Sequence, residues 1–305
     1  MIGDGEMIIG LAQTHIVWEN KNCNMKKLRG CLDAFVRYLK TSGAWNQEKR
    51  ENSILLFPEM SLTGFSMRTD VTAESENERE TVHMCEALAR SYGVSVGIGW
   101  VGRKEDTELC ENHYSVISPD GGEILDYVKL HPFAYSGEDR FFSGGSSLPV
   151  CRLHDMYLGA AVCFDLRFPE VFQILSDRAD MIVVPANWPE RRSAHWKALL
   201  AARAIENQCY IAGVNCCGLM DGQYYSGDSC LYAPDGSCME PVNVIDSCEL
   251  MKGICQDEHN SDYAYIEEER IFVYDAGDCA DIVDSVRKAF PVKSARRIKL
   301  YRELM

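Results

Sequence analysis

Short apolar runs alternate with amphipathic segments in the first part of the chain. Residues 7–13 form an apolar run that predicts a buried strand, and apolar residues at helical spacing follow over 25–39. The run 54–57 predicts a second buried strand, and 74–92 predicts a helix that ends at the cap residue Gly93. The chain therefore begins with two successive strand-helix units.

The pattern changes in the next part of the chain. Residues 94–101, 114–118 and 124–129 each predict a strand. The last two are joined by Pro-Asp-Gly-Gly at 119–122, which is typical of a tight turn. This segment therefore predicts a hairpin.

Strands and helices alternate again in the second half. The predicted elements are a strand that leads into Cys163, a helix at 171–177, a strand at 181–184, a helix at 194–207, a strand at 210–215 and strands on both sides of 234–236. The mixture of strand-helix units and hairpins indicates mixed sheets with helices outside them, rather than a purely doubly wound parallel sheet.

Composition indicates a single compact unit and excludes some partners. The chain has 305 residues, of which 46% are hydrophobic, and a net charge of −15. Such an acidic surface repels nucleic-acid backbones and anionic lipid head groups. We therefore expect one domain over residues 1–305, with no nucleic-acid partner and no membrane partner.

The N-terminus and the cysteines indicate a cytoplasmic protein. Asp4 and Glu6 stand where a signal peptide would carry basic residues, and the chain has no apolar run of 18 residues. The 14 cysteines are spread along the chain without a CxxC motif. We therefore expect reduced, mostly buried thiols, with neither a disulfide framework nor a metal site.

Cys163 differs from the other cysteines in its surroundings. The sequence Ala-Ala-Val-Cys-Phe-Asp-Leu-Arg-Phe-Pro-Glu over 160–170 carries this thiol from an apolar strand onto a polar turn. Pro169 suits the first position of the helix that follows. A thiol at this elbow is placed to meet a ligand, although burial as a small apolar side chain is the usual role of a free cysteine.

Two other apolar strands also end in an ionisable residue. Leu-Leu-Phe-Pro leads to Glu59, and Leu-Asp-Tyr-Val leads to Lys129. Each could be an ordinary solvated strand end. Three such ends suggest convergence at one sheet edge, where α/β proteins commonly bind ligands.

The three residues have complementary chemistry. A thiol with a usual pKa of about 8.5 needs a base or a neighbouring cation to become nucleophilic at neutral pH. Glu59 can act as the base, while Lys129 can favour the thiolate and then stabilise an oxyanion together with the backbone N–H of Phe164. The predicted chemistry is attack of Cys163 on a carbonyl carbon.

These segments resemble the motifs of the nitrilase, or carbon-nitrogen hydrolase, superfamily. The matching segments are Phe-Pro-Glu-Met at 57–60 with Thr-Gly-Phe at 63–65, Lys-Leu-His at 129–131, and Cys-Phe-Asp-Leu-Arg-Phe-Pro-Glu at 163–170. The resemblance implies a four-layer α-β-β-α sandwich. It also implies that Glu59 is the general base and acid, Lys129 the oxyanion stabiliser, Cys163 the nucleophile and Glu138 a second active-site glutamate.

Within that superfamily the chain looks most like the omega-amidase branch, on the segments 186–196, 202–208 and 225–229. The resemblance implies release of ammonia from a small carboxylate-bearing amide such as 2-oxoglutaramate, through a thioester and with no cofactor. A substrate carboxylate requires a cationic partner, for which Arg192 is the candidate; a solvated helix start is the alternative. Asn187 and Trp188 are expected to line the pocket, or Trp188 to pack beneath it.

Other polar residues have structural interpretations. We expect His131 and His195 to form structural hydrogen bonds rather than transfer protons. Arg203 and Glu206, three residues apart on a predicted helix, are expected to pair as ions. Asp165 and Arg167 are expected to brace the elbow in the same way.

The chain departs from the pattern of its group in two places. Phe164 stands where the group often has tyrosine. Phenylalanine lacks the tyrosine hydroxyl but keeps the backbone N–H donor, so we expect catalysis to survive while substrate preference can differ. The segment 246–270 carries eight acidic and two basic residues, and we expect a solvated excursion there, before a returning strand and a C-terminal tail at 290–305.

Rival functions remain open at this point. One is an N-carbamoyl amine amidohydrolase or a nitrilase of the same superfamily, and another is a non-catalytic scaffold on the same fold. A thiol-rich redox or metal-storage protein is a third class. The expected partner is a small-molecule amide, and the resemblance also implies a homodimer.

Overall fold

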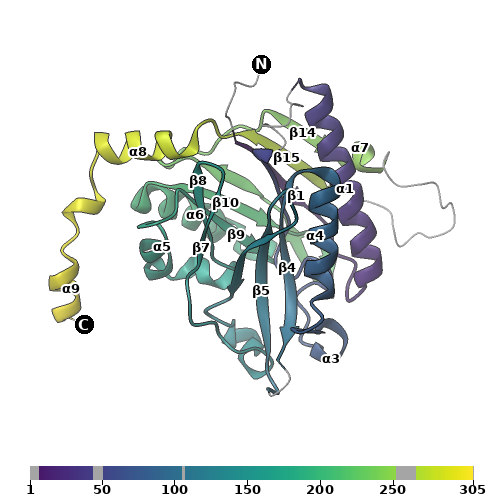
Figure 1. Ribbon diagram of the computed structural model, residues 1–305. Coiled ribbons are helices and arrows are strands. Elements are labelled where there is room, and N and C mark those ends of the chain that lie inside the picture. Colours follow the sequence, from purple (N-terminus) through teal and green to yellow (C-terminus); the bar gives the residue numbers. More distant parts are fainter. Residues whose placement is uncertain (1–6, 44–50, 105–106, 252–265, 305) are drawn as a thin grey trace.

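The fold is a four-layer α-β-β-α sandwich, in which two sheets lie face to face between two layers of helices (Figure 1). The computed structural model describes residues 7–43, 51–104, 107–251 and 266–304. Within these residues, no helix combines the length and apolar character needed to cross a membrane. The layer order agrees with the architecture that the family resemblance implies.

The first sheet has eight strands. Its main path runs in the order β14-β15-β1-β2-β4-β5-β6, and β3 pairs with β4. β1, β2 and β4 are parallel, whereas β15 and β5 run antiparallel to their neighbours. The strands are β1 (Ile8–Gln13), β2 (Ser53–Leu56), β3 (Glu74–Ser75), β4 (Ser95–Arg103), β5 (Cys110–Ile117), β6 (Glu123–Val128), β14 (Asn243–Asp246) and β15 (Arg270–Asp275).

The second sheet has five strands in the order β13-β10-β9-β8-β7, with β8, β9 and β10 parallel. A separate hairpin, β11-β12, lies outside both sheets. These strands are β7 (Val150–Leu153), β8 (Met156–Ala160), β9 (Met181–Ala186), β10 (Tyr210–Asn215), β11 (Cys217–Met220), β12 (Gln223–Ser226) and β13 (Cys230–Tyr232).

Four helices form the outer layers. α1 (Lys21–Thr41) and α4 (Glu80–Tyr92) cover the first sheet, and α5 (Pro169–Leu175) and α6 (Ser193–Asn207) cover the second. The remaining helices are α3 (Thr69–Thr72), α7 (Ser247–Met251), α8 (Cys279–Ala289) and α9 (Ile298–Leu304), and the 3-10 turns are η1 (Ala134–Ser136), η2 (Glu138–Arg140), η3 (Cys163–Arg167), η4 (Glu190–Arg192) and η6 (Lys293–Ala295). In Figure 1, α8 and α9 extend sideways from the sandwich.

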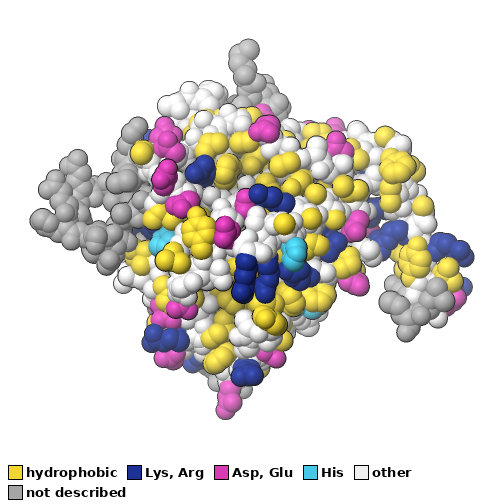
Figure 2. All heavy atoms as spheres, turned by 180° about the vertical axis from the view of Figure 1, so that it is seen from behind, with side chains coloured by type: hydrophobic (Ala, Val, Ile, Leu, Met, Phe, Trp, Pro, Cys, Tyr) yellow, Lys and Arg dark blue, Asp and Glu magenta, His cyan; other side chains and the backbone are white. Residues whose placement is uncertain are grey.

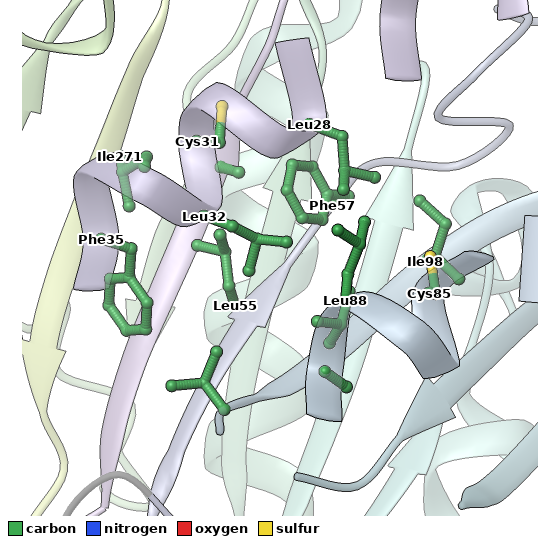
Figure 3. Packing of buried hydrophobic residues seen from close by; sticks show 14 of the residues in the cluster. Leu28, Cys31, Leu32, Phe35, Leu55, Phe57, Cys85, Leu88, Ile98 and Ile271 are labelled. Atoms are coloured by element: carbon green, nitrogen blue, oxygen red, sulfur yellow. The ribbon is translucent and has the colours of Figure 1, made fainter. Parts of the chain in front are cut away.

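Successive strand residues point to opposite faces, so both faces of each sheet are buried. In β2, Leu55 packs against the helices, whereas Ile54 and Leu56 pack between the sheets. In β9, Ile182 faces the helices and Val183 faces the other sheet. Figure 3 shows apolar side chains of α1 and α4 meeting those of the first sheet. Continuous apolar runs in the sequence therefore reflect burial on both sides.

Surface charge is unevenly distributed despite the net charge of −15. Figure 2 shows Lys and Arg side chains gathered near the centre of the face opposite that of Figure 1, beside a histidine and among apolar side chains. A locally basic region therefore exists on an acidic protein.

Two sequence-based predictions need correction here. The helix predicted over 74–92 begins at Glu80, because the Glu74 side chain accepts hydrogen bonds from the backbone N–H and hydroxyl of Thr81 while its backbone pairs in β3. After the turn at 234–236 there is a single bridge at Cys238 instead of a full strand.

The acidic segment 246–270 is only partly described, since 252–265 lie outside the described residues. Within the described part, the expectation of a solvated excursion is wrong for Glu269. Its carboxylate is fully buried, lies 2.8 Å from Lys27 Nζ and accepts hydrogen bonds from the backbone N–H groups of His15 and Ile266. Burial raises the pKa of Glu269, although the positive charge of Lys27 opposes this change. The ion pair attaches this segment to α1.

The Lys27→Met variant should lose about 3–5 kcal/mol of unfolding free energy, because it leaves the Glu269 carboxylate buried without its cation. Urea unfolding followed by circular dichroism would measure the loss. Lys288→Met removes a lysine from the exposed Lys288–Asp284 pair and should change stability little. Equal effects of the two substitutions would contradict this assignment.

Candidate active site

Several strand ends converge at one edge of the sandwich. β2 leads to Glu59, and β6, which runs parallel to β2 after two antiparallel reversals, leads to Lys129. On the facing sheet, β8 leads to Cys163 and β9 leads to Asn187. The topology therefore brings together side chains that are far apart in the sequence.

Glu59, Lys129 and Glu138 form a buried charged cluster. Lys129 Nζ lies 2.9 Å from Glu59 Oε1 and 2.9 Å from Glu138 Oε2. Asn112 on β5 donates its side-chain amide to Glu59 Oε1 at 2.9 Å and to Glu138 Oε1 at 3.3 Å. Each of these four residues is at most 1% exposed. One cation is thus shared by two carboxylates in a fixed arrangement.

Asn187 and Gly99 hold Glu59 in place. The backbone N–H of Asn187 donates to Glu59 Oε2 at 2.9 Å, and its side-chain amide donates to the Glu59 carbonyl at 2.7 Å. Gly99 on β4 lies directly beneath this loop, where an added Cβ would come within 2.5 Å of the Met60 nitrogen. Both sheets therefore fix the position of the Glu59 carboxylate.

Cys163 occupies a strained elbow. Its φ of 48° lies in the left-handed region, which is unfavourable for a residue other than glycine. Asp165 supports the turn: it accepts hydrogen bonds from the Val162 N–H at 3.0 Å, the Tyr127 hydroxyl at 2.6 Å and the His131 N–H at 3.0 Å. These bonds attach the elbow to the end of β6, next to Lys129.

The cluster sets the charge state of the thiol. Burial raises the pKa of Cys163 well above its usual value; the Glu59 carboxylate adds to this increase, and Lys129 opposes it. For Lys129, burial lowers the pKa, but the Glu59 and Glu138 carboxylates raise it above its usual value overall. Burial also raises the pKa of Glu138. Lys129 therefore acts on the thiol in the expected direction, since it lowers the pKa of Cys163, but burial and the two carboxylates outweigh this effect.

The thiol opens onto a cavity of about 170 Å³ that is rich in aromatic and cationic side chains. Arg167 stacks over the Trp188 ring at 4.9 Å, and Arg192 lies 5.3 Å from the centre of the Phe133 ring. The other lining residues are Phe65, Lys129, Ser136, Cys163, Phe164, Asn187, Pro189, Arg191, Gln223 and Tyr225. Three arginines thus face a small space above the thiol.

The structure places all eight predicted site residues in this region. Glu59 and Glu138 lie behind Lys129, whereas Phe164, Asn187, Trp188 and Arg192 line the cavity beside Cys163. Trp188 also donates its ring N–H to the Arg192 carbonyl at 2.8 Å, so it both lines the cavity and supports η4.

The other polar residues follow the predictions in part. His131 Nδ1 lies 2.8 Å from Asp165 Oδ1, and Arg203 pairs with Glu206 at 3.1 Å. His195 Nδ1 lies 3.5 Å from Arg167 Nη2. The predicted pairing of Asp165 with Arg167 is wrong, because three donors from neighbouring backbone and side chains occupy Asp165 while Arg167 lines the cavity.

Sequence reasoning missed three site residues: Asn112, Arg167 and Tyr225. Asn112 lies between the polar residues Glu111 and His113 on β5, so the local sequence gives no signal that sets it apart. Arg167 belongs to the cysteine motif and Tyr225 to a segment used for the branch resemblance. Their direction into the cavity depends on tertiary packing that neither segment encodes locally.

The raised pKa of Cys163 predicts its reactivity in the free protein. A thiol with a raised pKa stays protonated to higher pH, so alkylation by iodoacetamide should still accelerate above about pH 8.5. Peptide mass spectrometry after timed alkylation across pH would measure the rate at Cys163. A plateau already reached near neutral pH would show a thiolate and contradict the prediction.

A partly buried thiol at the cavity, an adjacent carboxylate and a shared lysine define a candidate hydrolase site, and comparison with known proteins identifies its class. Residues 8–243 match the carbon-nitrogen hydrolase family model, so the chain belongs to the carbon-nitrogen hydrolase family. The protein is a carbon-nitrogen hydrolase of the nitrilase superfamily.

Curated relatives narrow the class to amidohydrolases. The chain is 30% identical over 220 residues to 2-oxoglutaramate amidase of Bacillus subtilis, a match covering 70% of this chain and 85% of that protein. It is 34% identical over 237 residues to omega-amidase YafV of Escherichia coli K12, covering 77% of this chain and 85% of that protein.

Solved structures show the same fold. XC1258 of Xanthomonas campestris, a CN-hydrolase superfamily protein, superposes with a TM-score of 0.74 at 24% identity, covering 95% of this chain and 97% of that one. The second structure is a mutant amidase of Nesterenkonia sp. AN1 with an acetamide moiety added covalently to its active-site cysteine. It superposes with a TM-score of 0.74 at 22% identity, and the match covers 100% of this chain and 99% of that one.

Proposed function

We propose that the protein hydrolyses the amide of a small carboxylate-bearing substrate of the 2-oxoglutaramate type and releases ammonia through a thioester on Cys163. The observation that carries this proposal is the Glu59-Lys129-Glu138 cluster beside the thiol, under a cavity that three arginines face. The similarity to omega-amidases supports the same substrate class.

In the first half-reaction the Cys163 sulfur attacks the amide carbon while its proton passes to Glu59. The negative charge that develops on the amide oxygen is stabilised by Lys129 and by the backbone N–H of Phe164, at the start of η3. Proton transfer to the carboxylate during attack suits a resting thiol with a raised pKa.

Collapse of this intermediate breaks the carbon-nitrogen bond. Glu59 returns the proton to the departing nitrogen, which leaves as ammonia, and the acyl group remains on sulfur as a thioester. Glu59 then takes a proton from water as the water oxygen attacks the thioester. The carbon-sulfur bond breaks, the proton passes to sulfur, and the carboxylic acid product leaves with the thiol restored.

Glu138 keeps Lys129 positioned and charged in this mechanism. Both of its oxygens lie within 3.0 Å of Lys129 Nζ, and Oε2 also accepts the Phe133 N–H. The carboxylate therefore orients the lysine by contacts that do not involve the thiol. This gives Glu138 a positioning role rather than a proton-transfer role.

The cavity suits a small anionic substrate. Its volume of about 170 Å³ is below the range of roughly 300–1,000 Å³ that is typical of pockets for drug-sized ligands. Burial and the positive charge of Arg192 both lower the pKa of Arg167. Two guanidinium groups that repel each other are favourable partners for a substrate carboxylate.

Ammonia release from 2-oxoglutaramate, N-carbamoylputrescine and a simple nitrile, by wild type and by Arg192→Gln, would test this proposal. We expect turnover of 2-oxoglutaramate, with kcat/KM falling about 10-fold or more in Arg192→Gln through a higher KM, since a charged hydrogen bond contributes roughly 1.5–3 kcal/mol. The matched control is Arg178→Gln, a surface arginine outside the cavity lining. Turnover of N-carbamoylputrescine or the nitrile in place of 2-oxoglutaramate would overturn the substrate assignment.

A further inference from the structure

Three side chains of ligand type meet on the first sheet outside the active site: Glu76, Glu111 and His113. One potential ligand atom from each lies within 4.8 Å of the others. His113 Nε2 is 3.6 Å from Glu76 Oε1 and 3.5 Å from Glu111 Oε2. Glu111 and His113 are two apart on β5 and share a face of the sheet, whereas Asn112 between them reaches the active-site cluster on the other face. The group is therefore separate from the catalytic site.

His113 is held with one ring nitrogen unsatisfied. Its ring stacks on Trp100 with centroids 4.2 Å apart, and Nδ1 lies 2.8 Å from Asp126 Oδ1. The residue is 4% exposed, and within the described residues Nε2 has no hydrogen-bond partner; the same is true of Glu76 Oε1. Donation from Nδ1–H to a carboxylate is the usual way in which proteins orient a metal-binding histidine.

The surrounding charges favour an additional cation. Among the described residues, four carboxylates and two lysine or arginine groups take part in the ion pairs around His113. Arg79 lies 2.6 Å from Glu123 and 3.4 Å from Asp126, and Lys104 lies 2.7 Å from Glu111. With a neutral imidazole, the form that can bind a metal, the group carries two unbalanced negative charges, which is the charge of one divalent cation; with a protonated imidazole it carries one. Burial first, and then contact with the Glu111 carboxylate, raises the pKa of Glu76.

We propose that His113 Nε2, Glu76 and Glu111 bind a divalent transition-metal ion of the zinc type, with Asp126 as the partner that orients His113. Zinc bonds of about 2.0–2.2 Å in tetrahedral geometry separate the ligand atoms by about 3.3–3.6 Å. The observed separations of 3.5 and 3.6 Å agree with this spacing.

The metal would join β3 to β5. Glu76 directly follows β3, a two-residue strand that pairs with β4, and both other ligands belong to β5. The site is thus structural and departs from the sequence-based expectation of no metal. That expectation rested on the absence of cysteine and histidine spacing motifs, whereas these ligands come from two separate segments of the chain.

Protons and lysine compete with the metal for this site. Burial lowers the pKa of His113, but its contacts with Asp126 and Glu111 raise it overall, to about 9. The half-exposed Lys104 neutralises Glu111 from the solvent side. Lys104→Ala should therefore bind zinc more tightly than wild type, since it removes a competing cation without removing a ligand.

Zinc binding to the chelator-treated full-length chain would test the site. The 14 cysteines can also bind zinc, so wild type must be compared with the variants. Two quantities are measured for each protein: the zinc that stays bound per chain after gel filtration, and the change in Tm when zinc is added. Wild type should bind one zinc more than His113→Gln and Glu76→Gln, and only wild type should gain the matching Tm increase. Asp126→Asn should raise the Kd about 10–100-fold.

His83→Gln is the matched control, because His83 also contacts a glutamate, Glu86 at 3.2 Å, but stands exposed on α4. It should bind as much zinc as wild type. Glu76→Gln changes a partly exposed side chain, so it tests the site even if His113→Gln fails to fold. Equal zinc content and equal Tm shifts in wild type, Glu76→Gln and His83→Gln would overturn the proposal.

Discussion

The Cys163→Ala variant should lose ammonia release from the substrate of the wild type by about 10⁴-fold or more, the order of loss seen when a catalytic nucleophile is removed. Glu59 and Glu138 both contact Lys129, and the one hydroxyl among the aliphatic side chains of the cavity lining, that of Ser136, donates to the Phe133 carbonyl at 2.9 Å, so none of them is placed to replace the thiol. Coupled ammonia assays with purified protein would measure the loss.

Cys209→Ala is a suitable control for this variant. Cys209 is fully buried, but it precedes β10 at the end of the sheet opposite to the site. Its removal should leave kcat unchanged even if the Tm decreases. Substantial ammonia release by Cys163→Ala, or an equal loss in Cys209→Ala, would mean that Cys163 is not the nucleophile.

The Lys129→Gln variant should lower kcat by about 10²–10³-fold, the cost of losing one preorganised donor to a developing oxyanion. The substitution also leaves Glu59 and Glu138 facing each other without their shared cation, so the carboxylate pair should take up a proton. Steady-state kinetics should show the loss in kcat rather than in KM, because the interaction strengthens in the transition state.

Stability must be measured beside these kinetics, since Lys129 is almost completely buried. Lys21→Gln removes a partly exposed lysine that pairs with the buried Glu74 at 3.4 Å, outside the cavity lining, and should keep full activity. A folded Lys129→Gln protein with nearly normal kcat would show that oxyanion stabilisation comes from elsewhere.

Much of this site could be predicted because it lies at strand ends. A buried strand leaves a clear apolar run, and a charged residue immediately after the run marks the point where the chain leaves the sheet. Glu59, Lys129 and Cys163 all follow such runs. Glu59 and Lys129 follow strands of the first sheet and Cys163 follows a strand of the second, so local patterns mark the three strand ends, whereas their meeting depends on how the two sheets face each other.

The remaining features depend on contacts between distant segments. Asn112 becomes part of the site through two carboxylates that reach it from different loops. The charge state of Cys163 results from burial and three neighbouring charges, which the sequence alone does not position. For the same reason Glu269 resembled a surface acid in the sequence, although Lys27 pairs with it inside the protein.

The central claim is that Cys163 forms a thioester with the substrate acyl group. Mass spectrometry of enzyme quenched in acid milliseconds after mixing with 2-oxoglutaramate tests it most directly. The peptide that contains Cys163 should gain the mass of the acyl group, the adduct should disappear as substrate is exhausted, and Cys163→Ala should show none. Ammonia release at full rate without any adduct on Cys163, or with the adduct on another residue, would contradict the mechanism.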